Sequence, residues 1–233
     1  MKPRAMILAA GRGERLRPLT DKIPKPLLQV AGETLLGRHL LALSSANVEK
    51  AVINTAWLGW MIRHYVGNGS RFGLDVDYSD EGDRALETGG GIFKALPALG
   101  SAPFLLVNAD IWTTMDLASI TPPGADDLAS LVLVSNPAHN PGGDFALDDD
   151  RVLNPAGEGM PGETYTYSGI AILRPALFEH CKPGRFSLVP LLRRAIDQGR
   201  VCGQVFAGSW FDAGSADRLE QARQFVRESA RRK

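Results

Sequence analysis

The stretch of residues 6–26 constrains the fold more than any other part of this sequence. An apolar run, Ala5 to Ala9, leads into it, and the chain then becomes polar and glycine-rich within two residues. This pattern is typical of a buried parallel strand that ends in an open loop. Gly11 and Gly13 allow the backbone to approach a bulky ligand, because neither residue carries a Cβ atom. The sequence therefore predicts an α/β fold with a ligand-binding loop directly after its first strand.

The charges of this loop indicate a phosphate ligand. Arg12, Arg15 and Arg17 place three cations in six residues, and the only acid among them is Glu14. A glycine-rich turn with free backbone N–H groups and clustered arginines suits a di- or triphosphate. Prolines on both sides of Lys25 hold its backbone nearly extended. We interpret this restriction as a means of holding the lysine ammonium at a set point.

Two common phosphate-binding motifs do not account for the loop. The P-loop pattern G-x-x-x-x-G-K-[ST] is absent from the sequence. The dinucleotide pattern G-x-G-x-x-G fails at its third glycine, where Leu16 stands. The predicted second strand ends in Asn-Thr, without the acid that would bind a ribose diol. NAD binding is therefore disfavoured, and an NAD-dependent oxidoreductase is kept only as a remote alternative.

Residues 11–20, followed by Pro24-Lys25-Pro26, resemble the signature of sugar-1-phosphate nucleotidylyltransferases. The resemblance continues through residues 87–91, 108–110 and 210–214. It thus extends over nearly the whole chain. It implies a Rossmann-like nucleotidyltransferase fold, the nucleotide-diphospho-sugar transferase fold, with a mixed, mostly parallel central sheet. It also implies a reaction in which a nucleoside triphosphate and a sugar 1-phosphate give a nucleotide sugar and pyrophosphate.

The resemblance assigns roles to individual residues. The residues expected to contact the nucleotide are Ala10, Gly11, Gly13, Arg15, Lys25, Glu87, Gly89 and Gly90. The residues expected to contact the sugar are Asn108, Asp144, Ser168 and Gly169. Arg15 and Lys25 are expected to be catalytic, because two anionic substrates must be aligned and their charge neutralised. No general base is needed, since a sugar phosphate with a second pKa of about 6 is already a nucleophile near neutral pH.

Asp110 and Asp212 are the predicted ligands of one Mg²⁺. Asp110 follows the most apolar run of the chain, residues 104–107, and a carboxylate just past a buried strand is a common magnesium ligand. Asp212 lies just before the last predicted helix. A non-catalytic nucleotide-sugar sensor would lack one of these two acids, and both are present. The four histidines show no zinc-binding spacing.

Strands and helices alternate along the rest of the chain. The predicted strands are residues 50–54, 74–78, 103–108, 129–135, 164–173 and 201–206, and the predicted helices are 33–46, 57–66, 92–96, 175–180, 188–198 and 215–231. Three glycines would weaken the start of a helix. We therefore expect residues 87–91 to be a loop that lies against a base, with a flexible lid as the alternative. His39 lies on the apolar face of its helix and is expected to be a core histidine.

Residues 136–162 are rich in glycine and proline and are predicted to be irregular, either as a sugar-binding lid or as a plain surface hairpin. Within them, Asp148 to Asp150 are expected to form a solvated hairpin turn and not a calcium site, because the spacing of an EF-hand is missing. Asp144 leads into a strand on the expected sugar side. The sugar-binding part is accordingly expected to span residues 136–214 of a single domain, residues 1–233.

Bulk composition excludes several classes of partner. Lys and Arg number 26, as do Asp and Glu, so net charge gives no argument for nucleic acid or an anionic membrane. No apolar stretch approaches the roughly 20 residues of a membrane span. The two cysteines are isolated, which favours a reducing compartment. We expect a cytoplasmic enzyme that is a monomer or a small homo-oligomer.

Among members of the family, the resemblance is greatest to those that use UTP and N-acetylmuramic acid 1-phosphate in cell-wall recycling. This greater resemblance rests on residues 56–59, on residues 87–91 and on the short length of the chain. GTP with mannose 1-phosphate is the alternative pair. The lactyl carboxylate of N-acetylmuramic acid predicts a cation or backbone N–H donors in the sugar pocket. The candidates are the amides near Gly142 and Gly143 and the side chain of Arg151.

Overall fold

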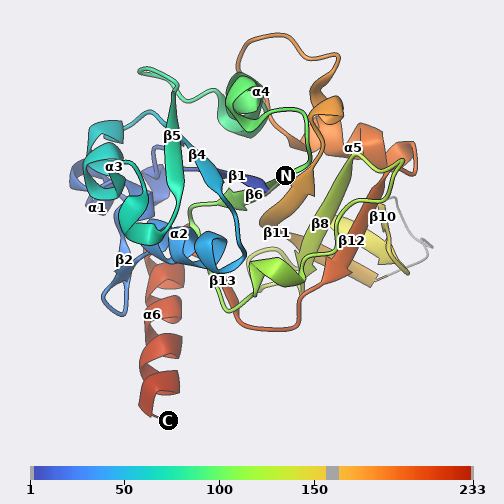
Figure 1. Ribbon diagram of the computed structural model, residues 1–233. Helices are drawn as coiled ribbons and strands as arrows, with labels where there is room; N and C mark the ends of the chain where they lie inside the picture. Colours follow the sequence, from blue (N-terminus) through green and yellow to red (C-terminus); the bar gives the residue numbers. More distant parts are fainter. Residues whose placement is uncertain (1–2, 156–162, 232–233) are drawn as a thin grey trace.

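A nine-stranded sheet forms the centre of the computed structural model, which describes residues 3–155 and 163–231 (Figure 1). Its strands are β1 (Arg4–Leu8), β4 (Lys50–Thr55), β5 (Asp75–Asp80), β6 (Phe104–Asn108), β8 (Ala129–Val134), β9 (Phe145–Asp148), β10 (Arg151–Leu153), β11 (Glu163–Leu173) and β12 (Val201–Val205). Their order across the sheet is β5-β4-β1-β6-β11-β8-β12-β10-β9. The strands β1, β4, β5, β6, β8, β9 and β12 run in one direction, and β10 and β11 run in the other. The predicted mixed, mostly parallel sheet is confirmed.

Helices cover both faces of the sheet. The described α-helices are α1 (Leu19–Lys22), α2 (Leu35–Ser45), α3 (Gly59–Val66), α4 (Glu87–Leu99), α5 (Val189–Asp197) and α6 (Ala216–Arg231). Side chains of a strand point alternately to its two faces. In β1, Ile7 accordingly packs in one cluster with α2 and α3, whereas Met6 packs in another with α4 and α5. This arrangement makes a three-layer α/β fold.

The carboxyl ends of two central strands bring distant loops together. Leu8 of β1 lies beside Asn108 of β6 in parallel register, and the Ala109 N–H donates to the Leu8 carbonyl at 3.0 Å. The loop after Leu8 and the acid that follows Ala109 therefore lie at the same edge of the sheet. Ligands of open α/β sheets bind at this edge.

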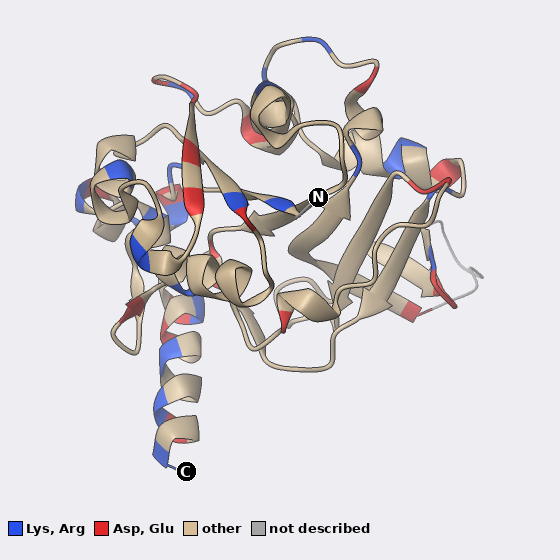
Figure 2. Cartoon of the chain, viewed as in Figure 1, with Lys and Arg blue, Asp and Glu red and all other residues tan. Residues whose placement is uncertain are grey.

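A small two-stranded ribbon joins the sheet to the last helix. It consists of β7 (Ile111–Thr113) and β13 (Trp210–Asp212), which pair antiparallel so that Asp212 lies opposite Ile111. Leu219 and Ala222 of α6 pack against Trp112 of this ribbon. The rest of α6 projects away from the sheet (Figure 1), and acidic and basic positions alternate along it (Figure 2). The predicted amphipathic final helix is confirmed.

The expectation that residues 87–91 form a loop was wrong, because α4 begins at Glu87. Gly89, Gly90 and Gly91 are buried in its first two turns. A Cβ atom on Gly89 would lie 2.5 Å from the Phe186 ring, and one on Gly90 would collide with the Gly184 carbonyl. The Gly90 N–H also donates to the Phe186 carbonyl at 3.0 Å. The glycines therefore allow residues 184–187 to pack closely against the helix, and this contact outweighs their low helix propensity.

The prediction that residues 136–162 are irregular was partly wrong, since β9 and β10 form a hairpin within them. The turn at Asp149 and Asp150 connects these strands, which confirms the predicted solvated hairpin turn. Residues 156–162 lie outside the described part of the chain. The predicted helix 175–180 is a short 3₁₀ helix, Pro175–Phe178. The predicted helix 92–96 is α4, which begins five residues earlier and ends three residues later, and the other predicted elements are present with ends shifted by at most two residues.

His39 is a core residue, as predicted. It is 2 % exposed, and its Nε2 lies 2.8 Å from the Ile111 carbonyl oxygen. Burial lowers the pKa of His39 to about 4, so the ring is neutral at physiological pH and donates one hydrogen bond. None of the described helices has the length and apolar character needed to cross a bilayer.

Candidate active site

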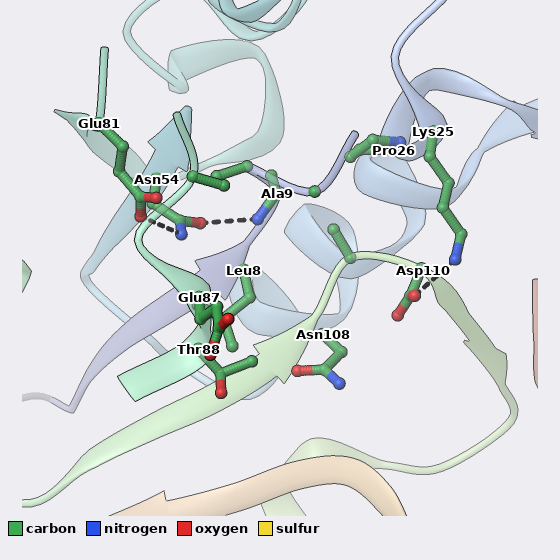
Figure 3. Close-up of a pocket in the computed structure, with 14 residues that line it drawn as sticks. Leu8, Ala9, Lys25, Pro26, Asn54, Glu81, Glu87, Thr88, Asn108 and Asp110 are labelled. Carbon is green, nitrogen blue, oxygen red and sulfur yellow. Dashed lines mark hydrogen bonds and ion pairs between the residues drawn. The ribbon is translucent and has the colours of Figure 1, made fainter. Parts of the chain in front are cut away.

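A cavity of about 180 Å³ opens at the carboxyl ends of β1 and β6 (Figure 3). Its walls come from the loop after β1, from the start of α4 and from the end of β6. The predicted site residues that line it are Ala10, Gly11, Lys25, Glu87, Asn108 and Asp110. We call it the first cavity.

An ion pair between Lys25 and Asp110 forms one wall of the first cavity. The Lys25 Nζ lies 2.6 Å from the Asp110 Oδ2, and Lys25 is only 8 % exposed. Burial alone would raise the pKa of Asp110, but the Lys25 ammonium more than offsets burial, so this pKa lies below its usual range. Asp110 is therefore a carboxylate at neutral pH. Figure 3 shows the lysine reaching from its own loop to the acid at the end of β6.

A buried polar network on the opposite wall was missed from the sequence. The Ala9 N–H donates to the Asn54 Oδ1 at 2.7 Å, and the Asn54 Nδ2 donates to the Glu81 Oε1 at 2.7 Å. The Glu81 Oε2 accepts from the Leu86 N–H at 2.6 Å. The network ties the end of β1 to the residues just before α4. The sequence shows an asparagine at the end of a predicted strand and an acid in a charged turn. Their spacing in the sequence does not predict that the two side chains form a hydrogen bond.

Of the three loop arginines, two are held by one acid. The Arg12 guanidinium donates to the Asp21 Oδ1 at 2.5 Å and stacks on the ring of Trp57. Arg17 lies 2.9 Å from the same oxygen. The hydrogen bond from Arg12 is the main reason that the pKa of Asp21 lies below its usual value. Arg12 and Arg17 therefore shape the loop, whereas Arg15 faces another cavity.

Gly13 is required by the fold of the loop itself, and its predicted approach to a ligand stays a prediction. Its φ of +69° lies in the left-handed region that favours glycine. A Cβ atom would also lie 2.9 Å from the Thr20 Cγ2 and 3.3 Å from the Lys25 Cβ. The glycine thus brings the loop close to Lys25.

The second cavity has a volume of about 420 Å³ and lies around Asp212. Its lining includes Arg15 from the first loop, Pro137, Ala138 and His139 from the β8–β9 connection, Trp210 and Phe211 from β13, and Ser215, Asp217, Arg218 and Gln221 from the start of α6. The Asp212 Oδ2 accepts from the Arg218 Nη1 at 3.0 Å, and the His139 Nε2 lies 2.8 Å from the same oxygen. The Asp212 Oδ1 accepts from the Gly214 N–H at 2.8 Å.

The structure brings the two predicted metal ligands onto neighbouring strands. Asp110 directly precedes β7, Asp212 ends β13, and the Ala213 N–H donates to the Asp110 carbonyl at 2.7 Å. Carboxylate oxygens are the ligands that Mg²⁺ prefers. No group of three or more His, Cys, Asp or Glu side chains with metal-binding geometry occurs in residues 3–155 and 163–231. The two acids therefore fit a magnesium ion that keeps waters and substrate oxygens as its other ligands.

Ser168 and Gly169 lie where the β11–β8 register shifts, between Tyr167 and Ala171. Gly169 has a φ of +82°, and a Cβ atom there would lie 2.7 Å from the Asn108 Nδ2. The Ser168 carbonyl accepts from the Trp210 Nε1 at 2.9 Å. These two residues thus support Asn108 of the first cavity and Trp210 of the second. Their direct contact with a sugar stays a prediction.

Asp144 holds the β8–β9 connection against β11. Its Oδ1 accepts from the Asn140 Nδ2 at 3.1 Å, and its Oδ2 accepts from the Tyr167 N–H at 2.9 Å. Asp144 lines neither cavity, and its contact with a sugar also stays a prediction. What the geometry shows is that it fixes the loop that carries His139.

The two candidates for recognition of a lactyl carboxylate were wrong. Arg151 lies 2.7 Å from the Asp127 Oδ1 and 3.1 Å from the Asp150 Oδ1, and it lines neither cavity. The Gly143 N–H donates to the Asn140 carbonyl at 3.1 Å. Because the arginine neutralises a buried acid and the amide closes a turn, neither group faces a ligand.

At the start of α4, Glu87 and Thr88 line the first cavity, while Gly89 and Gly90 face residues 184–187. The Glu87 Oε1 also lies 3.0 Å from the Arg185 Nη2. Contact of Gly89 and Gly90 with a nucleotide therefore stays a prediction.

Comparison with known proteins gives consistent results. Residues 4–141 match the family model described as nucleotidyl transferase. An N-acetylmuramate alpha-1-phosphate uridylyltransferase of Neisseria meningitidis serogroup B is 48% identical over 226 residues, which cover 94% of this chain and 96% of that protein. A protein of the same name from Caulobacter vibrioides is 36% identical, over 90% of this chain and 91% of its own.

The fold also matches solved structures. A UDP-glucose pyrophosphorylase complexed with UDP-glucose superposes with a TM-score of 0.77 at 19% identity, over 98% of this chain and 100% of that chain. At this identity the likeness shows the fold alone. The predicted nucleotidyltransferase fold is confirmed.

Proposed function

Because this chain belongs to the sugar-1-phosphate nucleotidylyltransferase family, we propose that it joins UTP to N-acetylmuramic acid α-1-phosphate with release of pyrophosphate, in cell-wall recycling. Two relatives aligned over at least nine-tenths of both chains carry this activity in their names. The observation that carries the proposal is the first cavity, where Lys25 and Asp110 meet beside the glycine- and arginine-rich loop.

The reaction requires alignment and charge neutralisation more than covalent work by the protein. A phosphate oxygen of the sugar phosphate attacks the α-phosphorus of UTP, and the bond from that phosphorus to the bridging oxygen of the β-phosphate breaks. Pyrophosphate leaves with the bonding electrons. Lys25 is held at the cavity wall and suits the α-phosphate or the attacking phosphate, where two anions must approach.

The loop after β1 is proposed to hold the departing pyrophosphate. Gly11 lines the first cavity and Arg15 lines the second, so the loop runs between the two. Backbone N–H groups of Gly11 and Gly13, together with the Arg15 guanidinium, suit the β- and γ-phosphates. In this arrangement the base and ribose occupy the first cavity, next to Glu87 and Asn108.

Asp110 and Asp212 are proposed to hold one Mg²⁺. The ion would supply Lewis-acid stabilisation of the phosphoryl oxygens. The protein's part is to hold the two side chains in place: Lys25 pairs with Asp110, Arg218 pairs with Asp212, and the pairing of β7 with β13 brings the two segments together.

Residues 136–214 are proposed to form the sugar side of the molecule, within a single domain that spans residues 1–233. Trp210 and His139 of this segment line the second cavity. Since UTP is a cytoplasmic metabolite, we place the reaction in the cytoplasm.

A substrate panel tests this proposal. Pyrophosphate release would be measured with UTP, GTP, dTTP and CTP against N-acetylmuramic acid, N-acetylglucosamine, glucose and mannose 1-phosphates. We expect UTP with N-acetylmuramic acid 1-phosphate to give the highest kcat/KM. A higher value for N-acetylglucosamine 1-phosphate, or for GTP with mannose 1-phosphate, would overturn the substrate pair and leave the reaction class intact.

A further inference from the structure

Resting on the proposed function, we propose that Arg218 is a specificity-determining residue that binds the carboxylate of an acidic sugar phosphate in the second cavity. The arginine that was expected to do so, Arg151, lines neither cavity, whereas Arg218 lines the second. Arg218 belongs to α6, which the sequence predicted only as a solvated helix. The assignment follows from where its guanidinium lies.

Arg218 has hydrogen-bonding capacity to spare. A guanidinium carries five N–H donors. In the described part of the chain one of them, on Nη1, bonds the Asp212 Oδ2, and the Nε is occluded and has no hydrogen-bond partner, so the donors that remain for a ligand are those of the Nη groups. The side chain is 14% exposed, so its direction is fixed by packing. A buried cation with unused donors at a cavity wall suits a carboxylate ligand.

The surroundings hold Arg218 in place. Gly214 lies under the guanidinium, and a Cβ atom at this position would collide with the Arg218 Nη2. The His139 Nε2 lies 2.8 Å from the same Asp212 oxygen, and its loop is fixed to β11 through Asn140 and Asp144. The wall that carries Arg218 is thus preformed.

Apart from the acid Asp217 and the amide Gln221, the remaining lining fits a carboxylate attached to hydrocarbon. Pro137, Ala138 and Phe211 supply apolar surface beside Arg218. Ser215 and the first turn of the sixteen-residue α6 add a helix N-terminus, whose partial positive charge also favours an anion. A lactyl ether, which carries a methyl group and a carboxylate, matches both parts of this surface.

The second cavity lies next to the reaction centre. Asp212 is on its wall, and the following residue, Ala213, donates to the Asp110 carbonyl at 2.7 Å. A sugar whose phosphate lies near Lys25 and Asp110 can therefore extend a substituent toward Arg218. The α-phosphate and the carboxylate would then be bound by different cations, Lys25 and Arg218.

The test compares two sugars that differ only by the lactyl group. The kcat/KM with UTP would be measured for N-acetylmuramic acid 1-phosphate and for N-acetylglucosamine 1-phosphate, in the wild type, Arg218→Gln and Arg218→Lys. Arg218→Gln should lower the ratio of kcat/KM for the lactyl sugar to kcat/KM for N-acetylglucosamine 1-phosphate about tenfold to a hundredfold, because it removes a charge-assisted hydrogen bond. Arg218→Lys should restore the ratio only in part, because an ammonium lacks the planar fork.

The ratio of the two kcat/KM values distinguishes recognition of the carboxylate by Arg218 from an indirect effect of Arg218 through Asp212. A change in Asp212 alone would slow both sugars alike and leave the ratio unchanged. The matched control is Arg227→Gln, which also removes an arginine from α6 but one that is 58% exposed and pairs with Glu220. This control should keep the wild-type ratio.

Each outcome is decisive. An unchanged ratio in Arg218→Gln, with a wild type that prefers the lactyl sugar, overturns the role of Arg218 and leaves the proposed function standing. A wild type that does not prefer the lactyl sugar overturns both the carboxylate site and the substrate pair. A lower ratio in Arg218→Gln with a normal ratio in Arg227→Gln supports the proposal.

Discussion

At the scale of single residues, the first cavity depends on an ion pair between groups that are 85 positions apart in sequence. Lys25 lies between two prolines and begins a short 3₁₀ helix, Lys25–Leu27, so the prediction of a nearly extended backbone was wrong; Asp110 follows a central strand. Both side chains are therefore held in position and do not have to reorient to form the ion pair. The pair presents a cation and an anion at the point where two anionic substrates are proposed to meet.

Replacement of Lys25 tests this arrangement. We expect Lys25→Ala to lower kcat/KM about a hundredfold or more, since it removes a preorganised charge from the transition state. We expect Lys25→Arg to recover only part of the activity. Urea unfolding of the same variants reports the fold, and its midpoint should change little because Asp110 remains open to the cavity. Full activity of Lys25→Ala with unchanged KM for both substrates would refute the role.

At the scale of elements, the β7–β13 ribbon carries both predicted metal ligands. Asp110 leads into one strand and Asp212 ends the other, so the ladder between the strands sets their separation. A change in either acid should act on the same ion. We expect this because the backbone pairing of β7 with β13 places the two acids on adjacent strands. The charge of either residue alone would not imply it.

Conservative variants of the two acids test the magnesium site. Asp110→Asn and Asp212→Asn should each lower kcat by about two to four orders of magnitude, as expected for loss of Lewis-acid stabilisation. Binding of Mn²⁺ in the presence of UTP, followed by water proton relaxation, should weaken in both. Asp75→Asn, at an exposed position of β5, is the control and should leave both measurements unchanged. Normal turnover and normal Mn²⁺ binding in both variants would exclude the assignment.

The start of α4 gives a second prediction at this scale. A Cβ atom on Gly90 would meet the backbone carbonyl of Gly184, which cannot move aside as a flexible side chain can. We expect Gly90→Ala to reduce the free energy of unfolding by about 1–3 kcal/mol, the usual effect of overpacking. Gly142→Ala, with no atom within 4 Å of the new Cβ, is the matched control. If Gly90→Ala kept wild-type stability and raised only the KM for UTP, the glycine would instead serve the nucleotide.

At the scale of the whole molecule, the sequence predicted whatever depends on local pattern. Apolar runs such as Phe104–Asn108 identified the central strands, and the loop motif predicted the residues around Lys25. Contacts between distant segments were not predictable in this way. The Asn54–Glu81 bond and the packing of Gly90 on residues 184–187 each join segments whose spacing has no local signature. Arg151 was misassigned for the same reason, because its partner Asp127 lies in the loop before β8, far from Arg151 in sequence.

The pairing of β7 with β13 has a consequence for the order of events during synthesis. Residues 4–141, which supply every residue that lines the first cavity, leave the ribosome well before residues 210–214. At that stage the pocket still lacks two supports, because residues 184–187 pack on the start of α4 and Gly169 packs on Asn108. The emergence of β13 later adds the second acid and the second cavity together. The nucleotide pocket and the reaction centre are thus completed at separate stages of synthesis.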